Sequence, residues 1–246
     1  MKPAPLLLAL FLACPVAFAE GINPFPPDGE GTKFHIVFEK TETDYSPEEL
    51  NRIFQVDGDE IHVYRDWDKP SAPFAAIVTA DDYENFVIEL EYKWGERRFA
   101  PRADHKRDAG LLFFVREPER VWPPAVECQI QETDTGDLWS IYSLTSVHTD
   151  GAGNFDPNGE LTVVGKDGDF NGVNRADANA VEQPGWNRVR VEVRNGAGKF
   201  YLNDKLVNEF ETAAERDGTP VTSGRIALQA EGAELTYRNV RIQQLD

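Results

Sequence analysis

Residues 86–93 read FVIELEYK and residues 188–193 read RVRVEV. In both stretches apolar residues alternate with polar ones, which is the period of a β-strand that lies with one face on a core. The same patterns predict strands at residues 53–56, 60–64, 74–79, 111–116, 126–131, 139–144, 161–164, 200–203, 206–210, 225–229 and 235–243. Many short strands separated by turns predict an all-β sandwich or barrel.

Turn and helix signals fit this arrangement. The one helix signal is SPEE at residues 46–49, where serine suits the N-cap, proline suits the first helical position and Glu49 closes a capping box. We expect this helix to be short and peripheral. Pairs of residues that tolerate the positive φ of a hairpin turn stand between predicted strands. These pairs are Asp57-Gly58, Asn195-Gly196 and Asn203-Asp204.

The first 19 residues have the pattern of a secretory signal peptide. Lys2 precedes the apolar run Leu6–Leu12, and Ala17-Phe18-Ala19 has the small-x-small pattern that a signal peptidase accepts. The apolar run is shorter than the about 20 residues that a transmembrane helix needs. We therefore expect an exported protein, periplasmic or extracellular, without a membrane span.

The segments after the apolar run decide the domain boundaries. Cys14 raises the alternative of a lipid anchor, which Phe11-Leu12-Ala13 disfavours because it is a poor lipobox.

Residues 20–33 contain three prolines and three glycines and are expected to form a flexible leader. Residues 34–246 are then expected to form a single domain, because sandwiches routinely reach this length.

The charge and the cysteines exclude some classes of protein. The formal net charge is −18, and a chain this acidic repels a phosphate backbone, which argues against nucleic-acid binding. After removal of residues 1–19 the only cysteine is Cys128, so no intrachain disulfide can form. The stability of the fold must therefore come from its core.

The segment AVECQIQE at residues 125–132 carries the strongest chemical signal. In a regular strand Glu127, Gln129 and Gln131 share one face, and this face is too polar for a core. It lies either on an ordinary solvent-facing strand or in a groove, and the absence of lysine and arginine favours the groove. The spacing Glu-x-Gln-x-x-Glu also resembles the signature of laminarinase-type retaining glycosidases, in which Glu127 and Glu132 would be the paired carboxylates. Gln129 stands where that signature has aspartate, which argues against this mechanism.

Two further positions are candidates for sugar contacts. In the segment 106–113, KRDAGLLF, the small pair Ala109-Gly110 indicates close approach of a backbone or a ligand. Arg107 and Asp108 at the start of this strand would offer hydrogen-bond donors and an acceptor to sugar hydroxyls, or form a local ion pair. Trp139 follows the Glu127 strand after a short loop and is the tryptophan expected to stack on a sugar ring.

His148 and several aspartates are candidates for proton transfer and for metal binding. His148 titrates near neutral pH and is a candidate acid or base. The other histidines lie in separate segments without ligand spacing, so no zinc site is expected. Calcium is a possible cofactor at Asp167-Gly168-Asp169 or Asp134-x-x-Asp137, although the same segments also suit turns.

Several segments together resemble the 3-keto-disaccharide hydrolase family. They run from about Phe54 to the C-terminus, and their order and spacing carry the resemblance more than any one of them. The segments are YENFVIELEY at 83–92, KRDAGLL at 106–112, VECQIQE at 126–132, WNRV at 186–189, LNDKLV at 202–207, GRIALQAEG at 224–232 and YRNVRI at 237–242. The resemblance implies a concanavalin-like jelly roll of two antiparallel sheets with a sugar groove on the concave one.

The resemblance also implies a mechanism that differs from that of ordinary glycosidases. A C3 carbonyl acidifies the proton on C2, so that a base removes this proton, the C1 substituent leaves by β-elimination and water then adds. We expect Glu127 or His148 to be the base and the acid, and Arg107, Gln129 and Trp139 to position the sugar, with Asp108 and Glu132 beside them. Two alternatives remain: a lectin-like module that binds glycan without turnover, and a retaining β-glucanase.

Overall fold

The computed structural model describes residues 21–26, 33–39, 45–176 and 182–246. The predicted signal peptide, with Cys14, lies outside the described residues. In the part of the chain that is described, no helix has the length and apolarity that a membrane crossing requires.

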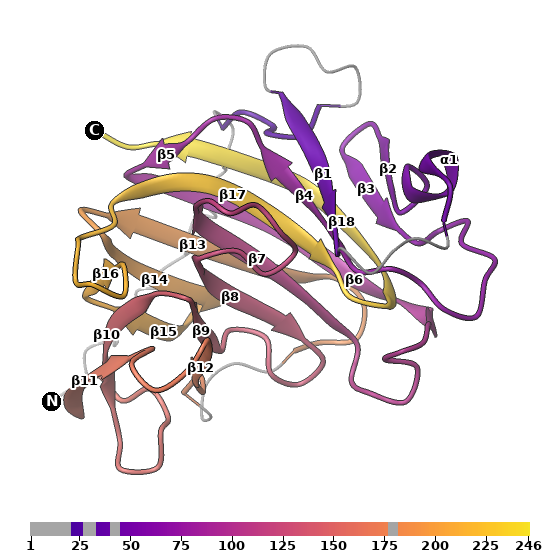
Figure 1. The fold of residues 1–246 in the computed structure, drawn as a ribbon. Helices are drawn as coiled ribbons and strands as arrows, with labels where there is room; N and C mark the ends of the chain where they lie inside the picture. Colours follow the sequence, from indigo (N-terminus) through magenta and orange to yellow (C-terminus); the bar gives the residue numbers. More distant parts are fainter. Residues whose placement is uncertain (1–20, 27–32, 40–44, 177–181) are drawn as a thin grey trace, which may run out of the picture.

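Most of the chain forms two antiparallel sheets that pack face to face (Figure 1). The first sheet has seven strands in the spatial order β15 (Lys205–Phe210), β14 (Ala197–Leu202), β13 (Asn187–Arg194), β6 (Phe86–Arg98), β18 (Ala233–Gln244), β3 (Glu60–Val63) and β2 (Phe54–Asp57). The two stretches that open the sequence analysis are neighbours in this sheet, since Ile88 of β6 pairs with Val191 of β13.

The second sheet has eight strands and carries the candidate site. Its order is β1 (Phe34–Phe38), β4 (Ala75–Thr79), β17 (Ser223–Ala230), β7 (Asp108–Val115), β8 (Ala125–Gln131), β9 (Leu138–Ile141) and β12 (Phe170–Val173), and β5 (Tyr83–Glu84) pairs with β17. In Figure 1 the strands β17, β7 and β8 lie over strands of the seven-stranded sheet.

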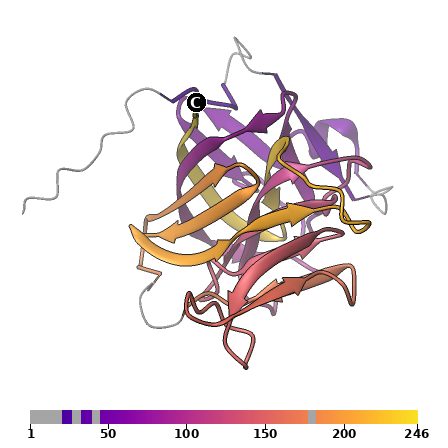
Figure 2. The same ribbon diagram turned by 90° about the vertical axis from the view of Figure 1, so that its left-hand side faces the viewer.

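A three-stranded sheet of β11 (Glu160–Val164), β10 (Leu144–Thr149) and β16 (Thr212–Ala214) lies at one end of the sandwich (Figure 2). The sequence predicted one strand over residues 139–144, but the structure has two, and they belong to different sheets. The chain breaks at Tyr142, whose φ is 46° and whose N–H donates to the Asp169 carbonyl at 2.8 Å. The segment after the break therefore leaves the eight-stranded sheet.

The main hydrophobic core lies between the two large sheets. Alternate residues such as Ile88 and Val191 from one sheet, and Leu111 and Ile226 from the other, are fully buried there. Cys128 lies in the same core. The alternation of apolar and polar residues predicted this burial, and the all-β sandwich of two antiparallel sheets is confirmed.

The local signals for the helix and the turns are also confirmed. The helix α1 (Pro47–Leu50) has no buried residue and begins at Ser46, which forms both hydrogen bonds of the capping box with Glu49. The predicted turns include Gly58, Asn195 and Asn203 at positive φ, because each turn follows the twist of its hairpin.

Part of the predicted leader is packed on the domain. Ile22 forms two backbone hydrogen bonds of 2.9 Å with Ile242 of β18. Phe25 is fully buried, and its ring lies edge-on to Phe34 at 5.8 Å between centroids. The expectation of a flexible leader therefore does not hold for residues 21–26, because one large apolar side chain is enough to anchor this segment.

Candidate functional site

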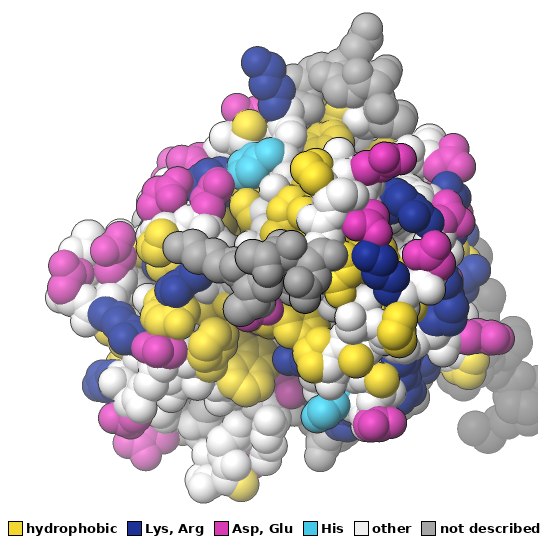
Figure 3. All heavy atoms as spheres, turned by 45° about the vertical axis from the view of Figure 1, so that its right-hand side comes forward, with side chains coloured by type: hydrophobic (Ala, Val, Ile, Leu, Met, Phe, Trp, Pro, Cys, Tyr) yellow, Lys and Arg dark blue, Asp and Glu magenta, His cyan; other side chains and the backbone are white. Residues whose placement is uncertain are grey.

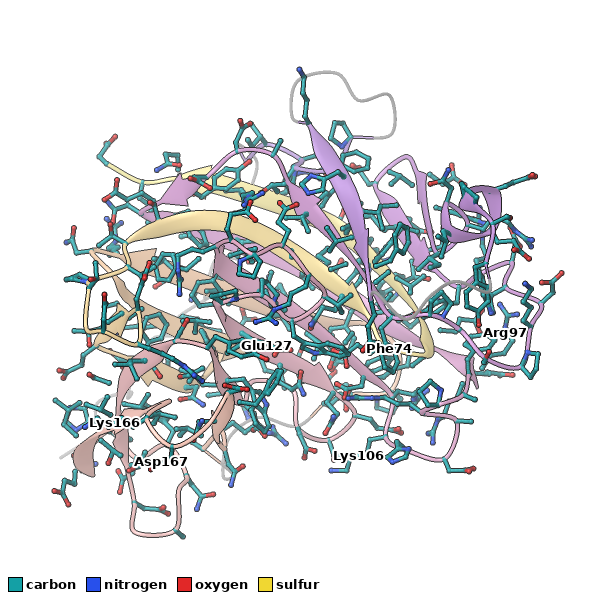
Figure 4. All side chains as sticks on the ribbon, viewed as in Figure 1. Phe74, Arg97, Lys106, Glu127, Lys166 and Asp167 are labelled. Atoms are coloured by element: carbon teal, nitrogen blue, oxygen red, sulfur yellow. The ribbon has the colours of Figure 1, made fainter. Side chains whose placement is uncertain are left out.

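β8 presents three polar side chains to the outer side of the eight-stranded sheet. The apolar residues between them lie in the main core, so Glu127, Gln129 and Gln131 point the other way. They line a cavity of about 490 Å³, here called the Glu127 cavity. Figure 4 shows Glu127 near the middle of the sheet that faces the viewer. The groove, rather than an ordinary solvent-facing strand, is thus the arrangement found. The rest of the lining includes Arg102, Asp108, Glu231, Trp122, Trp139 and Phe170.

The neighbouring strand β7 leaves room for these side chains because it carries a glycine. Gly110 pairs with Gln129 across the two strands. A Cβ at Gly110 would lie 2.1 Å from Oε1 of Glu127 and 2.1 Å from Oε1 of Gln229 on β17. The small pair Ala109-Gly110 therefore marks a close approach, and the groups that approach are side chains of the protein itself.

Arg102 links two carboxyl groups at the cavity. It lies in the loop between β6 and β7, and its Nη1 donates to the buried Asp108 at the start of β7. The same Nη1 lies 3.2 Å from Oε2 of Glu231, which directly follows β17. Gln131 also donates to Asp108, at 2.7 Å. Asp108 is thus held by two donors, and Arg102 faces Asp108 and Glu231 together.

The two glutamates have raised pKa values. Burial raises the pKa of Glu127 well above its usual range, the charge of Glu231 raises it further, and Arg102 partly offsets both effects. Burial also raises the pKa of Glu231 to about 7, although Arg102 and a hydrogen bond from Trp122 lower it. The raised pKa favours the protonated form of Glu127, and Glu231, with a pKa of about 7, titrates near neutral pH. Buried carboxyl groups of this kind are typical of acid and base catalysts.

Aromatic side chains form the walls of the cavity. Trp139 on β9 pairs with Gly172 on β12, and its indole covers Gly172 so closely that a Cβ there would lie 3.2 Å from three ring atoms. Trp122 lies edge-on to Phe74 at 5.4 Å between centroids. Phe170 is 46% exposed. Aromatic faces of this kind stack on the apolar C–H faces of sugars. Figure 3 shows hydrophobic side chains gathered near the middle of a face whose margins are mostly charged.

Arg107 and Glu132 lie in a different cavity, of about 440 Å³, together with Trp94 and Glu182. Arg107 Nη2 donates to Glu132 at 2.7 Å, and Arg98 also pairs with this carboxylate, at 3.0 Å. The local ion pair is therefore the alternative that the structure supports for Arg107. Glu132 is not brought together with Glu127, so these two residues do not form the paired carboxylates of a retaining glycosidase.

His148 is also separated from the Glu127 cavity. It lies on β10 of the small sheet, as a consequence of the break at Tyr142. Its Nδ1 lies 3.0 Å from the Gly159 carbonyl and its Nε2 lies 2.9 Å from a Glu211 carboxylate oxygen. These two contacts raise the pKa of His148. Among the described residues that line the Glu127 cavity there is no histidine.

The aspartates considered for calcium have other partners. Asp134 pairs with Lys106 at 2.5 Å and Asp169 with Arg216 at 2.7 Å. The Asp137 carboxylate accepts a hydrogen bond from the Arg175 N–H at 2.8 Å. Figure 4 shows Asp167 beside β11, away from Glu127. Within the described ranges, no cluster of three metal-ligating side chains occurs.

Sequence reasoning missed Arg102, Phe170 and Glu231 of the cavity lining, and also the buried Gln229, whose side chain approaches Glu127 over Gly110. Arg102 lies in a loop with no strand pattern, and nothing in its neighbours indicates its contacts. Gln229 and Glu231 belong to the segment 224–232 that carries part of the family resemblance. A polar residue at 229 that alternates with apolar neighbours, followed by an acid at 231, is the signal from which both could have been found.

An outward-facing cavity with buried carboxyl groups and aromatic walls, on one sheet of a jelly-roll sandwich, fits a carbohydrate-active protein of hydrolase-like type. A family model described as the 3-keto-alpha-glucoside-1,2-lyase-like domain matches residues 28–243. The chain therefore belongs to this family, as its sequence resemblance predicts. No curated protein matches the chain.

Solved structures with similar folds include carbohydrate-active proteins of low identity. A candidate glycosyl hydrolase from Parabacteroides distasonis is 21% identical, with 87% of this chain and 100% of that chain covered and a TM-score of 0.48. LamAcat from Zobellia galactanivorans is 12% identical, with coverage of 93% and 99% and a TM-score of 0.46. The carbohydrate binding module CBM66 from Bacillus subtilis is 13% identical, with coverage of 77% and 89% and a TM-score of 0.45.

Proposed function

We propose that this protein cleaves glycosides whose sugar carries a 3-keto group, by elimination across C1 and C2 followed by hydration. The observation that carries the proposal is the meeting of two buried carboxyl groups, Glu127 and Glu231, with Arg102 in one aromatic-walled cavity. Elimination needs a base, an acid for the leaving group and a group that stabilises the enolate oxygen. These three residues can supply all three functions.

The protonation states suggest which residue has which role. Glu231 lies 3.2 Å from Arg102, which favours its carboxylate form, so Glu231 is proposed as the base that removes the C2 proton. The electron pair of that C–H bond moves to the C3 oxygen, and Arg102 stabilises the negative charge there. The C1–O bond then breaks, and protonated Glu127 gives its proton to the departing oxygen. The product is an enone together with the released alcohol.

Hydration restores both residues to their starting forms. Glu127, now a carboxylate, takes a proton from water while the hydroxide adds to C1. Glu231 returns its proton to C2, which gives the free 3-keto sugar. Trp139 and Trp122 are proposed to hold the sugar between them, and Gln129 and Gln131 to contact its hydroxyls. His148, Arg107 and Glu132 have no role in this scheme because they line other parts of the surface.

The leaving group distinguishes the acid from the base. The substrates are a 3-keto disaccharide, its unoxidised parent and a p-nitrophenyl 3-keto-glucoside, whose leaving group needs no protonation. Glu127→Gln is expected to lose about 10²-fold or more of its turnover of the disaccharide and far less with the p-nitrophenyl substrate. Glu231→Gln is expected to lose turnover of both substrates, because the C2 proton must be removed before either leaving group departs. Glu160→Gln on the exposed strand β11 is the control for the loss of one negative charge in Glu231→Gln.

Other outcomes would support other functions. Cleavage of the unoxidised parent would indicate an ordinary glycosidase such as a β-glucanase. Glycan binding by the wild-type protein without cleavage of any substrate would indicate a lectin-like module. Loss of turnover in His148→Ala would restore the role that the sequence predicted for this histidine. The predicted signal peptide at residues 1–19 further leads us to propose that the protein acts outside the cytoplasm.

A further inference from the structure

Gln229 on β17 directs a buried oxygen toward the space above Gly110, which the carboxyl group of Glu127 also occupies. Its side chain is fully buried, and its Nε2 donates to the Val121 carbonyl at 2.9 Å. This bond sets the orientation of the amide, because an oxygen in the place of Nε2 would face another oxygen. Oε1 therefore points away from Val121, and no described residue donates a hydrogen bond to it.

The group next to this oxygen is the carboxyl of Glu127. Oε1 of Gln229 and Oε1 of Glu127 both lie 2.1 Å from the position that a Cβ of Gly110 would take, so the two oxygens are close to one another above the glycine. Two oxygens that only accept hydrogen bonds repel one another, and a buried acceptor without a donor destabilises the folded state. A proton between the two oxygens removes both penalties. Of the two groups, Glu127 is the one that can carry it.

We propose that Gln229 is a positioning residue that accepts a hydrogen bond from protonated Glu127 and thereby keeps Glu127 in the acid form that leaving-group departure requires. The catalytic use of this proton rests on the function proposed above. The protonation itself does not, because it follows from the arrangement of Gln229, Gly110 and Glu127. During elimination the departing oxygen of the substrate takes the proton from Glu127, and the hydration step returns it.

Gln129 contacts the same carboxyl group with the opposite polarity. In the amide orientation that its surroundings require, its nitrogen donates to Oε1 of Glu127 at 2.8 Å and to the Ala109 carbonyl at 2.9 Å. A donor stabilises the carboxylate, whereas the Gln229 acceptor stabilises the protonated acid. The two glutamines therefore have opposite effects on the same titration.

The charged groups that act on Glu127 come from other elements of the structure. Glu231 at the end of β17 opposes ionisation of Glu127, and Arg102 in the loop before β7 favours it. Asp108 at the start of β7 is paired with Arg102. Gln229 is uncharged, so its replacement changes the surroundings of the Glu127 carboxyl without removing a charge.

The test is a pair of matched substitutions, Gln229→Met and Gln129→Met, each of which replaces an amide by an apolar side chain of similar length. The carboxylic C=O infrared band that disappears in Glu127→Gln reports the protonation of Glu127 and is followed against pH. Gln229→Met is expected to lower the midpoint of this titration by about one pH unit, and Gln129→Met to raise it. The high-pH limb of kcat/KM for a 3-keto disaccharide should move in the same directions.

Gln229→Glu is the rescue variant. In its protonated form a glutamate at this position can donate to the Val121 carbonyl with one oxygen and accept from Glu127 with the other. As long as this glutamate is protonated, it is therefore expected to bring the midpoint of the Glu127 titration back toward the wild-type value that Gln229→Met lowers.

Each result has one meaning. A midpoint that does not move in Gln229→Met, or that moves in the same direction in both methionine variants, overturns the inference, because a packing defect would not depend on the polarity of the amide. Opposite shifts without turnover of any 3-keto glycoside would support the inference and contradict the proposed function. Turnover of a 3-keto glycoside by the wild-type protein, together with an unshifted titration midpoint in Gln229→Met, would support the proposed function and contradict the inference.

Discussion

Gly110 lies on β7 opposite Gln129, and the side-chain oxygens of Glu127 and Gln229 occupy the space above its Cα. In most strands a change from glycine to alanine removes a flexible residue and is tolerated. Here the added methyl group would lie 2.1 Å from both oxygens, so both side chains must move. The residue type at this one position thus determines whether the carboxyl and the amide can meet.

We predict that Gly110→Ala destabilises the protein by about 1–3 kcal/mol through overpacking and removes most of its turnover. Urea unfolding measures the first effect and kcat/KM for a 3-keto glycoside measures the second. Gly151→Ala is the matched control, because the space around Gly151 is open. If Gly110→Ala and Gly151→Ala behaved alike, the close approach at Gly110 would have no energetic consequence.

At the scale of elements, the paired strands β9 and β12 hold the Trp139 wall of the cavity. Trp139 and Gly172 face one another in register, and the missing side chain at Gly172 lets the indole lie flat on the sheet. The chain then turns away at Tyr142, so that β10 joins a different sheet. The register between β9 and β12 places Trp139 in the cavity, and the break in the chain at Tyr142 places His148 outside it.

Trp139→Ala is predicted to raise KM for a 3-keto glycoside about tenfold, which corresponds to about 1.4 kcal/mol of stacking, and to change kcat much less. Steady-state kinetics separate the two constants. Trp186→Ala is the control, because Trp186 lies between Lys93 and Arg238 on the other sheet. A drop in kcat alone would contradict a role for Trp139 in holding the sugar.

In a chain of net charge −18, the two buried glutamates Glu127 and Glu231 have a consequence for the stability of the whole molecule. The folded protein raises the pKa of Glu127 and Glu231, so it binds protons more tightly at these sites than the unfolded chain does. Their contribution to stability is present below the unfolded pKa of about 4.3 and is lost as the pH rises through the folded values. The free energy of unfolding should therefore fall between weakly acidic and alkaline pH.

A comparison of variants separates the contribution of Glu127 to the free energy of unfolding from the repulsion between the negative charges on the surface. Glu127→Gln is expected to be more stable than the wild-type protein at about pH 9 and to lose this advantage at about pH 5, because the neutral amide never has to ionise. Urea unfolding at both pH values measures the difference. Glu160→Gln removes an exposed charge instead and should change stability by less than about 0.5 kcal/mol at either pH. A Glu127→Gln difference that did not depend on pH would show that Glu127 has the same pKa in both states.

The sequence by itself determined the features that depend on near neighbours in the chain. Alternation with a period of two placed Glu127, Gln129 and Gln131 on one face of a strand, and Ser46 with Glu49 formed the predicted capping box. These features rest on backbone geometry that repeats within a few residues, so a local pattern is sufficient to predict them.

Only the tertiary structure decided which side chains meet on that face. Arg102 comes from a loop. Gln229 on β17 and Glu231 directly after this strand lie about a hundred positions further along the chain than Glu127. They reach Glu127 because β7 lies between β17 and β8 in the sheet. His148 lies outside the cavity because the chain leaves the eight-stranded sheet near Tyr142 and β10 joins the three-stranded sheet. The order in which the strands pair depends on how all strands together bury their apolar faces between the two sheets. A local sequence pattern predicts which face of a strand is buried, but it does not predict which strands lie next to it.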